Sequence, residues 1–437
     1  MAIAWLLDAP LVAGVLPTVV SVLGLLGAVY LVHGRGRRWW LRAVPISVAV
    51  GAAVAALAQL VIVVARPFPD PLPLRVLFWT AVAVAAASLF VAGLVAGGRR
   101  GRARLVLGAV ALLLVVSTVG VKINAFYGYR PTLAAVLGVP AADEIDLASL
   151  PTAPTTVAPQ QGEPLSARWR PPPDMPAEGK ITHVTIPGTV SGFAARQALV
   201  YLPPAYLGSV RATLPVLVLI PGQPGGPQDW LVAGQLADVM NRFAAAHHGL
   251  APVVVVPDAM GSAFGNPLCI DSRLGNSETY LAVDVPAWTA ANLHVDQRHL
   301  TIGGFSFGGT CALQLAVRRP DVYPSFLDIS GQSEPTLGDR AQTVAAAFGG
   351  DEEAFRRVNP LDEMQRTTFP NTAGIIAVGL DDTMYRPDAE KVAAAARAAG
   401  MAITLTELNG AHSWTIASQA LSGALPWISG RTGLLPP

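Results

Sequence analysis

The sequence is poor in charged residues, and this shortage limits what the protein can be. Only 14% of its 437 residues are Asp, Glu, Lys or Arg, whereas 52% are apolar. Soluble proteins average about 25% charged residues, so part of this chain should lie in a membrane. The net charge is only +1, and no basic stripe interleaved with aromatic residues occurs, so the sequence gives no support for nucleic-acid binding.

Motifs for metals and nucleotides are also missing. No HExxH, CxxC or Walker pattern occurs, so we expect no metal ion, nucleotide or other cofactor. Cysteine is scarce, because the chain has only Cys269 and Cys311.

The apolar residues are concentrated in the first 125 positions, where they form four long runs. A helix needs about 20 apolar residues to cross the hydrocarbon of a bilayer, and the first three runs meet this length. The fourth is marginal unless its helix continues past Lys122, whose long side chain can snorkel. Buried core helices are disfavoured by these lengths, and a cleaved signal peptide by the lack of a basic residue before the first run. The runs cover residues 11–32, 43–65, 76–96 and 105–121.

Arginines predict the orientation of these helices. Four lie between the first and second runs and four between the third and fourth, which places both loops in the cytoplasm. With four spans, the N-terminus and everything after the fourth run then lie outside the cytoplasm. The sequence therefore predicts a multi-pass cell-membrane protein with an extracytoplasmic C-terminal domain. The arginines are Arg35, Arg37, Arg38, Arg42, Arg99, Arg100, Arg102 and Arg104.

The organisation changes twice after the membrane region, which we assign to residues 1–125. Residues 126–180 form a juxtamembrane segment and a linker that is rich in Pro, Ala and Thr. Residues 181–437 alternate short apolar strands with helical stretches, a pattern typical of a mostly parallel sheet buried on both faces. We expect an α/β fold here, with strands in ITHVTIP, QALVYLPP, LPVLVLIPG, APVVVVPDA, HLTIGGF, SFLDIS, GIIAVGL and AITLTEL.

One stretch of this domain, GGFSFGG at residues 303–309, predicts a catalytic serine. A predicted strand runs into Ser306 and an amphipathic helix, TCALQLAVRRP, follows it. This is the setting of a nucleophile elbow, where Gly304 and Gly308 avoid collisions in a tight turn. An incidental serine on a surface loop is the alternative, which this context disfavours.

A serine nucleophile needs a base and an acid, in the chain order Ser, Asp or Glu, His. His412 is the only histidine downstream of Ser306, and it follows a predicted strand in NGAHSW. The acid should follow the strand GIIAVGL, where Asp381 and Asp382 both qualify. We favour Asp382, three residues after Gly379, and keep Asp381 in reserve.

Backbone amides should stabilise the oxyanion that forms during ester cleavage. One donor is normally the residue after the nucleophile, here Phe307, and the other follows an early strand, where Gln223 precedes Pro224. Three further residues near strand or turn ends are candidates for the substrate pocket, although the two tryptophans also suit packing. They are Trp230, Asp258 and Trp414.

The domain resembles the esterase family of α/β-hydrolases, which includes esterase D-like enzymes, feruloyl esterases and secreted mycolyltransferases. The resemblance covers about residues 182–430 and rests on SETYLAVDVPAW, HLTIGGFSFGG, FGGDEEAFRRVNP and AHSW. It implies an α/β-hydrolase fold with Ser306 as nucleophile, Asp382 as acid and His412 as base. Mycolyltransferases often have Glu as the acid and Met after the nucleophile, whereas this chain has Asp382 and Phe307.

The two cysteines both lie in the domain that we place outside the cytoplasm, where disulfides persist. We therefore predict that Cys269 and Cys311 form a disulfide, with two buried thiols as the alternative.

These features predict a membrane-anchored serine esterase that acts through an acyl-enzyme. The expected partners are membrane lipid and a substrate that is an ester-containing small molecule, a lipid or an envelope glycolipid. A mycolyltransferase-like acyltransferase of the cell envelope is one alternative, since the triad does not decide the acceptor. A non-catalytic membrane scaffold with a hydrolase fold is another.

Overall fold

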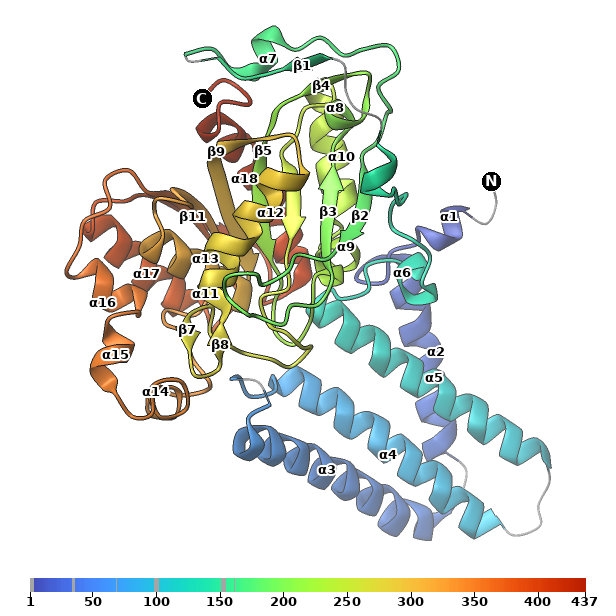
Figure 1. Ribbon diagram of the computed structural model, residues 1–437. Helices are drawn as coiled ribbons and strands as arrows, with labels where there is room; N and C mark the ends of the chain where they lie inside the picture. The colour runs from blue at the N-terminus through green and yellow to red at the C-terminus, as the bar shows by residue number, and fades with distance from the viewer. Residues whose placement is uncertain (1–3, 34–35, 68, 98–101, 151–154, 161) are drawn as a thin grey trace. The chain divides into compact units, whose positions relative to one another are not determined.

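The computed structural model describes residues 4–33, 36–67, 69–97, 102–150, 155–160 and 162–437. The chain forms two compact units, Met1–Val139 and Pro140–Pro437, which are drawn in Figure 1. Three of the arginines used to predict the orientation, Arg35, Arg99 and Arg100, lie outside the described residues.

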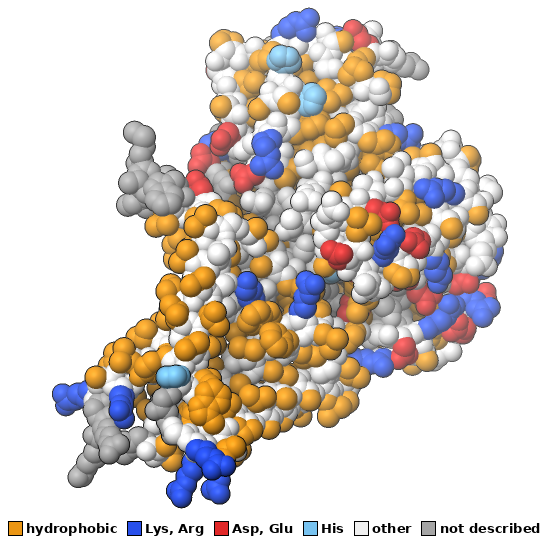
Figure 2. All heavy atoms as spheres, turned by 180° about the vertical axis from the view of Figure 1, so that it is seen from behind, with side chains coloured by type: hydrophobic (Ala, Val, Ile, Leu, Met, Phe, Trp, Pro, Cys, Tyr) orange, Lys and Arg blue, Asp and Glu red, His pale blue; other side chains and the backbone are white. Residues whose placement is uncertain are grey.

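The first unit is built from helices, and its described residues contain four that are long and apolar enough to cross a membrane. They cover Val15–Val32, Trp39–Ala65, Leu74–Ala96 and Arg102–Tyr127. Large apolar side chains are exposed along all four, and Figure 2 shows them covering the helices, with Lys and Arg at the helix ends. The helices of this unit are α1 (Ala4–Leu7), α2 (Val15–Val32), a π-helical turn η1 (Trp39–Ala43), α3 (Val44–Ala65), α4 (Leu74–Gly97), α5 (Arg102–Tyr127) and α6 (Leu133–Leu137).

The fourth span is longer than its apolar run, because α5 continues past Lys122 to Tyr127. Its length is therefore sufficient to cross a bilayer. Small polar side chains connect the helices: the Thr118 hydroxyl donates to the Val20 carbonyl at 2.8 Å, and Ser47 bonds Ser88 at 3.0 Å. Such hydrogen bonds are typical of packed membrane helices.

The second unit contains an eight-stranded sheet whose strands are the eight predicted from the sequence. Their order across the sheet is β12-β11-β10-β9-β5-β6-β3-β2. The pairings from β12 to β6 are parallel, and β3 is antiparallel to both β6 and β2. The strands are β2 (Lys180–Val184), β3 (Ala198–Leu202), β5 (Leu214–Ile220), β6 (Val253–Val256), β9 (Val295–Phe305), β10 (Ser325–Ile329), β11 (Ala373–Gly379) and β12 (Ala402–Leu408).

The apolar strands bury both of their faces, because helices cover the sheet on each side. Successive side chains of a strand point to opposite faces. On β5, Val216 and Val218 belong to one core cluster, whereas Leu217 and Leu219 belong to the other. The first cluster includes residues of α12 (Val285–Asn292), α13 (Phe307–Arg318), α16 (Pro360–Met364) and α17 (Arg386–Ala398); the second includes residues of α9 (Gln228–Val232), α10 (Leu236–Ala246) and α18 (Trp414–Arg431).

The remaining elements are short and lie outside the main sheet. They are η2 (Leu147–Ser149), β1 (Thr155–Val157), α7 (Leu165–Arg168), α8 (Pro204–Leu207), β4 (Val210–Ala212), β7 (Asp271–Ser272), β8 (Gly275–Asn276), α11 (Ser277–Thr279), η3 (Tyr280–Asp284), α14 (Arg340–Phe348) and α15 (Glu352–Arg356).

The segment expected to be a free linker is packed onto the second unit instead. Strand β1 pairs with β4, and Leu165 and Trp169 are buried in the core. The Trp169 indole donates to the carbonyl of His248 at 2.8 Å. These few large apolar anchors are not apparent in a composition rich in proline; the second compact unit, which we call the catalytic unit because it contains the predicted serine, begins at Pro140.

The order of the strands creates a place for a ligand. Strands β5 and β9 are neighbours in the middle of the sheet. From β5 the chain adds β6 on one side, whereas from β9 it adds β10, β11 and β12 on the other side. In parallel α/β sheets, ligands bind beyond the carboxyl ends of the two strands where this direction changes. Those strands are β5 and β9, which end at Ile220 and Phe305.

Candidate active site

Ser306 lies in the sharp turn between β9 and α13. Its backbone has φ 58° and ψ −117°, a conformation that is strained for a residue with a side chain. The Ser306 N–H donates to the Ile329 carbonyl of β10 at 2.8 Å, which helps to hold the turn. Strain of this kind is typical of nucleophile elbows, where it exposes the serine at the top of the sheet.

The glycines of the motif are required by close backbone contacts. A Cβ atom on Gly304 would lie 2.3 Å from the Gly308 carbonyl carbon, and one on Gly308 would lie 2.1 Å from the Ile220 carbonyl oxygen. Both distances are shorter than any real contact of a Cβ atom. The spacing in GGFSFGG therefore has the steric cause that the sequence predicted.

His412 and Asp382 meet at the carboxyl edge of the sheet. The distance between His412 Nδ1 and Asp382 Oδ2 is 2.9 Å. Asp382 is buried, and its Oδ1 accepts the N–H of Tyr385 at 3.2 Å. The imidazole is partly exposed, with 23% of the side chain accessible. A buried carboxylate therefore orients a histidine that can still reach a substrate.

The choice between the two neighbouring aspartates follows from this geometry. Asp381 is exposed, and its backbone N–H, not its side chain, connects the two loops by donating to the Gly410 carbonyl at 2.8 Å. The Leu380 N–H donates to Leu408 at 2.7 Å in the same junction. This backbone pairing aligns the loop after β11 with the loop after β12 and favours Asp382 as the partner of His412.

Two aromatic rings that the sequence analysis missed enclose the imidazole. The ring of Phe305 stacks on His412 with centroids 4.7 Å apart, and Tyr385 stacks on it at 4.2 Å. Phe305 directly precedes Ser306, so the base contacts the residue beside the serine. The position of Phe305 was a usable signal, whereas nothing in the sequence around Tyr385 pointed to this contact.

Trp230 and Trp414, predicted as pocket residues, continue this aromatic contact into the core. Trp414 packs against Phe305 at 5.0 Å and against Trp230 at 5.3 Å. Trp230 is fully buried, and its indole donates to the Ile220 carbonyl at 3.0 Å. Its burial and these contacts favour the packing role that the sequence analysis kept as the alternative. Trp414 is also buried and supports Phe305.

The turn after β5 lies beside the serine. A Cβ atom on Gly222 would be 3.5 Å from the Cβ of Ser306, so the backbone that leads into Gln223 passes the nucleophile. The Gln223 side chain is held by Asn266, which donates to its Oε1 at 3.1 Å, and by the Phe264 carbonyl, which accepts from its Nε2 at 3.0 Å.

The second expected oxyanion donor is Phe307, the first residue of α13. The first N–H groups of a helix have no partner within the helix and are free to bind an anion. Phe307 and the turn around Gln223 thus approach Ser306 from two elements, as an oxyanion hole requires.

Asp258 is also buried, and the structure assigns it contacts inside the protein instead of a pocket surface. Its carboxylate binds the Arg196 guanidinium at 2.8 Å and accepts the N–H groups of Met260 and Gly261. Arg196 in turn donates to the Gly225 carbonyl at 2.9 Å. Asp258 therefore supports the glycine-rich turn through Arg196, a residue that the sequence analysis did not single out.

Cys269 and Cys311 form a disulfide, with Cα atoms 5.4 Å apart. Cys311 lies in α13, the helix that follows Ser306. The same loop is also fixed by Gln314, which donates to the Cys269 carbonyl at 3.1 Å. The disulfide connects the helix behind the serine to the loop that leads into β7.

Asp328, at the end of β10, is a buried acid close to the elbow. Its pKa is raised to about 7, mainly by burial and to a smaller extent by the nearby Asp388, although the Gly331 N–H, which donates to Oδ1 at 2.9 Å, acts to lower it. Between about pH 4 and pH 7, the Asp328 carboxyl group therefore keeps its proton in the folded protein, whereas the same group has lost it in the unfolded chain. Stability conferred by this group falls as the pH rises through that window.

Metal ligands are not clustered near these residues. Within the described part of the chain, no group of three or more His, Cys, Asp or Glu side chains is arranged to hold a metal ion.

Known proteins share both the sequence pattern and the fold. The family model described as "Putative esterase" matches residues 194–428. An uncharacterized protein of Corynebacterium glutamicum is 38% identical over 384 residues, which is 84% of each chain. This coverage exceeds the catalytic unit, so the similarity extends into the helical unit.

Two solved structures have the same fold as the catalytic unit. A ferulic acid esterase has a TM-score of 0.50 at 20% identity, over 60% of this chain and 100% of that chain. An S-formylglutathione hydrolase from Agrobacterium tumefaciens has the same TM-score and identity, over 59% of this chain and 97% of that chain. The family match and the fold together show that the chain belongs to this esterase family of α/β-hydrolases and is a serine hydrolase, either a carboxylic ester hydrolase or an acyltransferase.

Proposed function

We propose that the protein is a membrane-anchored serine esterase that cleaves esters outside the cytoplasm through a covalent acyl-enzyme. Ser306 is the nucleophile, His412 the base and Asp382 the acid. The observation that carries this proposal is the 2.9 Å contact between His412 Nδ1 and the buried Asp382 carboxylate. This contact leaves the other imidazole nitrogen, Nε2, free to accept a proton.

Acylation begins when Ser306 Oγ attacks the ester carbonyl carbon. His412 Nε2 accepts the hydroxyl proton, and Asp382 stabilises the imidazolium that results. The carbonyl oxygen becomes an oxyanion that accepts hydrogen bonds from the N–H groups of Phe307 and Gln223. When the tetrahedral intermediate collapses, the C–O bond to the alcohol breaks and His412 returns the proton to the leaving alcohol.

Deacylation repeats these steps with a second nucleophile. His412 removes a proton from water, the hydroxide adds to the acyl carbon, and Ser306 leaves with the proton that His412 supplies. Phe305 and Tyr385 limit the rotation of the imidazole throughout, since both of their rings stack on it.

The substrate carries an apolar acyl or alcohol group. Three large apolar side chains are exposed on the loops that hold the site residues: Phe264, Leu380 and Met384. The backbone carbonyl of Phe264 accepts the hydrogen bond from the side chain of Gln223. Leu380 and Met384 lie two residues before and after Asp382. Lipids and envelope glycolipids are the ester substrates that fit such a rim and a membrane anchor.

A fluorophosphonate probe tests the nucleophile. Probe labelling of the purified protein should disappear in Ser306→Ala and persist in Ser330→Ala, a matched serine whose backbone also has positive φ. Labelling that survives in Ser306→Ala at the wild-type rate would assign the nucleophile to another residue.

The extracytoplasmic position rests on the arginine-rich loops and on the disulfide, which is rare in reducing compartments. Cysteine labelling with a membrane-impermeant maleimide tests it. In intact cells, Thr368→Cys, on an exposed loop of the catalytic unit, should be labelled, whereas Arg38→Cys, at an arginine-rich helix end, should not. The reverse pattern would invert the topology.

Acyl transfer is the second candidate, and the four membrane helices favour it. They hold the acyl-enzyme beside lipid hydroxyl groups at high effective concentration. A hydroxyl group of a sugar or lipid then replaces water in deacylation and yields a new ester. Turnover of a p-nitrophenyl ester with and without glycan or glycerol acceptors separates the two reactions. New ester formed at the expense of free acid would establish transfer, and an unchanged yield of acid would reject it for those acceptors.

A further inference from the structure

The helical unit contains a pocket that the esterase chemistry does not use. Its volume is about 220 Å³, and it lies between the start of α4 and the end of α5. Because α4 begins where α5 ends, the two helices are antiparallel and the pocket lies near one face of the membrane. Its lining residues are Arg75, Val76, Trp79, Lys122, Ile123, Ala125 and Phe126.

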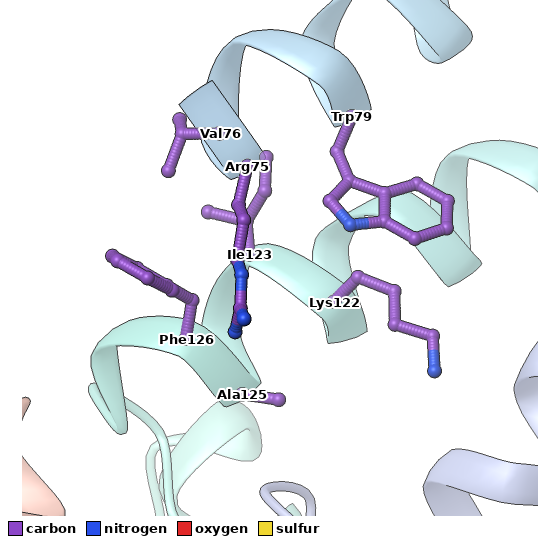
Figure 3. A pocket seen from close by; sticks show the side chains of 7 residues that line it. All are labelled: Arg75, Val76, Trp79, Lys122, Ile123, Ala125 and Phe126. Atoms are coloured by element: carbon purple, nitrogen blue, oxygen red, sulfur yellow. The ribbon is translucent and has the colours of Figure 1, made fainter. Parts of the chain in front are cut away.

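Each of the two helices contributes one basic and one aromatic side chain to this pocket. Arg75 and Trp79 are four residues apart on α4, and Lys122 and Phe126 are four residues apart on α5. Residues at this spacing share one face of a helix. Figure 3 shows Arg75 reaching from α4 toward α5, with Trp79 and Lys122 to one side of it and Phe126 to the other. The lining therefore combines two basic side chains with apolar and aromatic groups.

The residues that line the pocket include two basic side chains and no acidic one. Neither Arg75 nor Lys122 forms an ion pair within the residues that the structure describes. The whole segment from residue 1 to 139 has twelve Lys and Arg residues but only two acids, Asp8 and Asp70. Long basic side chains near the ends of membrane helices can reach the level of the lipid headgroups, where an anionic lipid would supply the missing partner.

Arg75 lies at the N-terminus of α4, where the helix dipole disfavours a positive charge. It is the second residue of α4, and the first turn of this helix contains no acidic residue. A helix N-terminus carries a partial positive charge, which disfavours a cation and attracts an anion. The partial positive charge at the start of α4 and the Arg75 guanidinium therefore both favour a negatively charged ligand at the same end of the helix.

The depth of the pocket indicates where this ligand comes from. Lys122 lies five residues before the end of α5, which is about 7 Å along a helix axis. Trp79 lies one turn inside Arg75, and tryptophan prefers the level of the lipid headgroups. A ligand with its anion at Arg75 and Lys122 would rest its apolar part against Val76 and Ile123.

We propose that this pocket binds the phosphate of an anionic membrane lipid. Arg75 and Lys122 hold the phosphate oxygens, and the lipid chains lie along the apolar wall toward the hydrocarbon. The pocket is at the end of α5 from which the chain continues into the catalytic unit, so the bound lipid lies in the leaflet that faces that unit. The proposal does not depend on the chemistry assigned to Ser306.

Native mass spectrometry of the full-length protein in neutral detergent tests this site. Phosphatidylglycerol should bind saturably and more tightly than phosphatidylcholine with the same chains. Arg75→Gln and Lys122→Gln should each weaken phosphatidylglycerol binding roughly fivefold, the equivalent of about 1 kcal/mol for one charge near a lipid surface. Arg104→Gln, which removes an exposed cation at the opposite end of α5, is the matched control and should leave binding unchanged.

Charge-retaining variants and competition with inorganic phosphate distinguish this site from a folding defect and from a site for a soluble anion. The charge-retaining variants Arg75→Lys and Lys122→Arg should restore binding to within about twofold, which a folding defect would not do. Equal weakening by Arg104→Gln, or equal binding of the two lipids, would show general attraction to charge and overturn the proposal. Displacement of phosphatidylglycerol by millimolar inorganic phosphate would overturn the assignment to a lipid and indicate a site for a soluble anion.

Discussion

Replacing Asp382 by asparagine should abolish most of the esterase activity through the tautomer of His412. In the wild type, Asp382 Oδ2 lies 2.9 Å from Nδ1 of the imidazole, and Oδ1 accepts the N–H of Tyr385 at 3.2 Å. In Asp382→Asn, the Tyr385 N–H keeps the amide oxygen on its own side, which turns the amide NH₂ toward Nδ1. The imidazole must then carry its proton on Nε2, where it can no longer accept the proton of Ser306.

The size of this effect follows from what the substitution leaves in place. The volume and the hydrogen bond to Tyr385 are kept, so the loss is catalytic rather than structural. Triads that lose their acid in this way lose about 10⁴-fold in kcat, which corresponds to about 5.5 kcal/mol in the barrier. Asp381 provides a control on the same turn: its side chain is exposed, and Asp381→Asn should change activity by no more than about twofold.

The assay is hydrolysis of a p-nitrophenyl ester by the purified full-length variants, with thermal unfolding as a check of the fold. We expect Asp382→Asn to fall to about one ten-thousandth of the wild-type kcat with a similar unfolding temperature. The reasoning is refuted if Asp382→Asn keeps more than a tenth of the wild-type kcat, or if Asp381→Asn is the more damaging substitution.

Three other predictions follow from the contacts around the site. Replacing Cys269 and Cys311 by serine opens a cross-link between residues 42 apart and should cost about 4 kcal/mol of unfolding free energy; equal denaturation midpoints with and without the disulfide would contradict this. In Asp328→Asn the proton-linked loss of stability between about pH 4 and pH 7, at most about 1.4 kcal/mol per pH unit, should vanish, so thermal unfolding should be less sensitive to pH than in the wild type. Tyr385→Leu removes a ring stacked 4.2 Å from His412 and should lower kcat by about two- to tenfold with little change in KM; an effect confined to KM would assign this ring to substrate binding.

Much of the fold was predictable because its signals are local. The central strands β3, β5, β6 and β11 are apolar runs whose residues are all buried, and proline or glycine bounds most of these runs. The glycines around Ser306 were equally informative, because a Cβ atom at Gly308 would overlap the backbone of β5. The fourth membrane helix was harder to delimit, because its last turns contain Lys122 and Asn124 and are less apolar than its centre.

The features that could not be predicted are side-chain contacts between segments that are distant in the sequence. Trp230 and Asp258 follow strand or turn ends in the expected places, yet both are buried through contacts with distant residues, Trp230 with Trp414 and Asp258 with Arg196. Tyr385 stacks on a histidine on a different loop, and Leu165 and Trp169 anchor a segment whose composition is that of a linker. The presence of Arg75 and Lys122 in the lining of one pocket likewise becomes visible only when α4 and α5 are placed side by side.

The most direct test of the proposed chemistry is the mass of the peptide that contains Ser306, taken from enzyme quenched in acid during turnover of an ester. The account predicts that this peptide carries the acyl group of the substrate, that the modified residue is Ser306, and that the adduct is absent in Ser306→Ala. Steady turnover by the wild type without any acylated peptide, or an acyl group found on another residue, would contradict it.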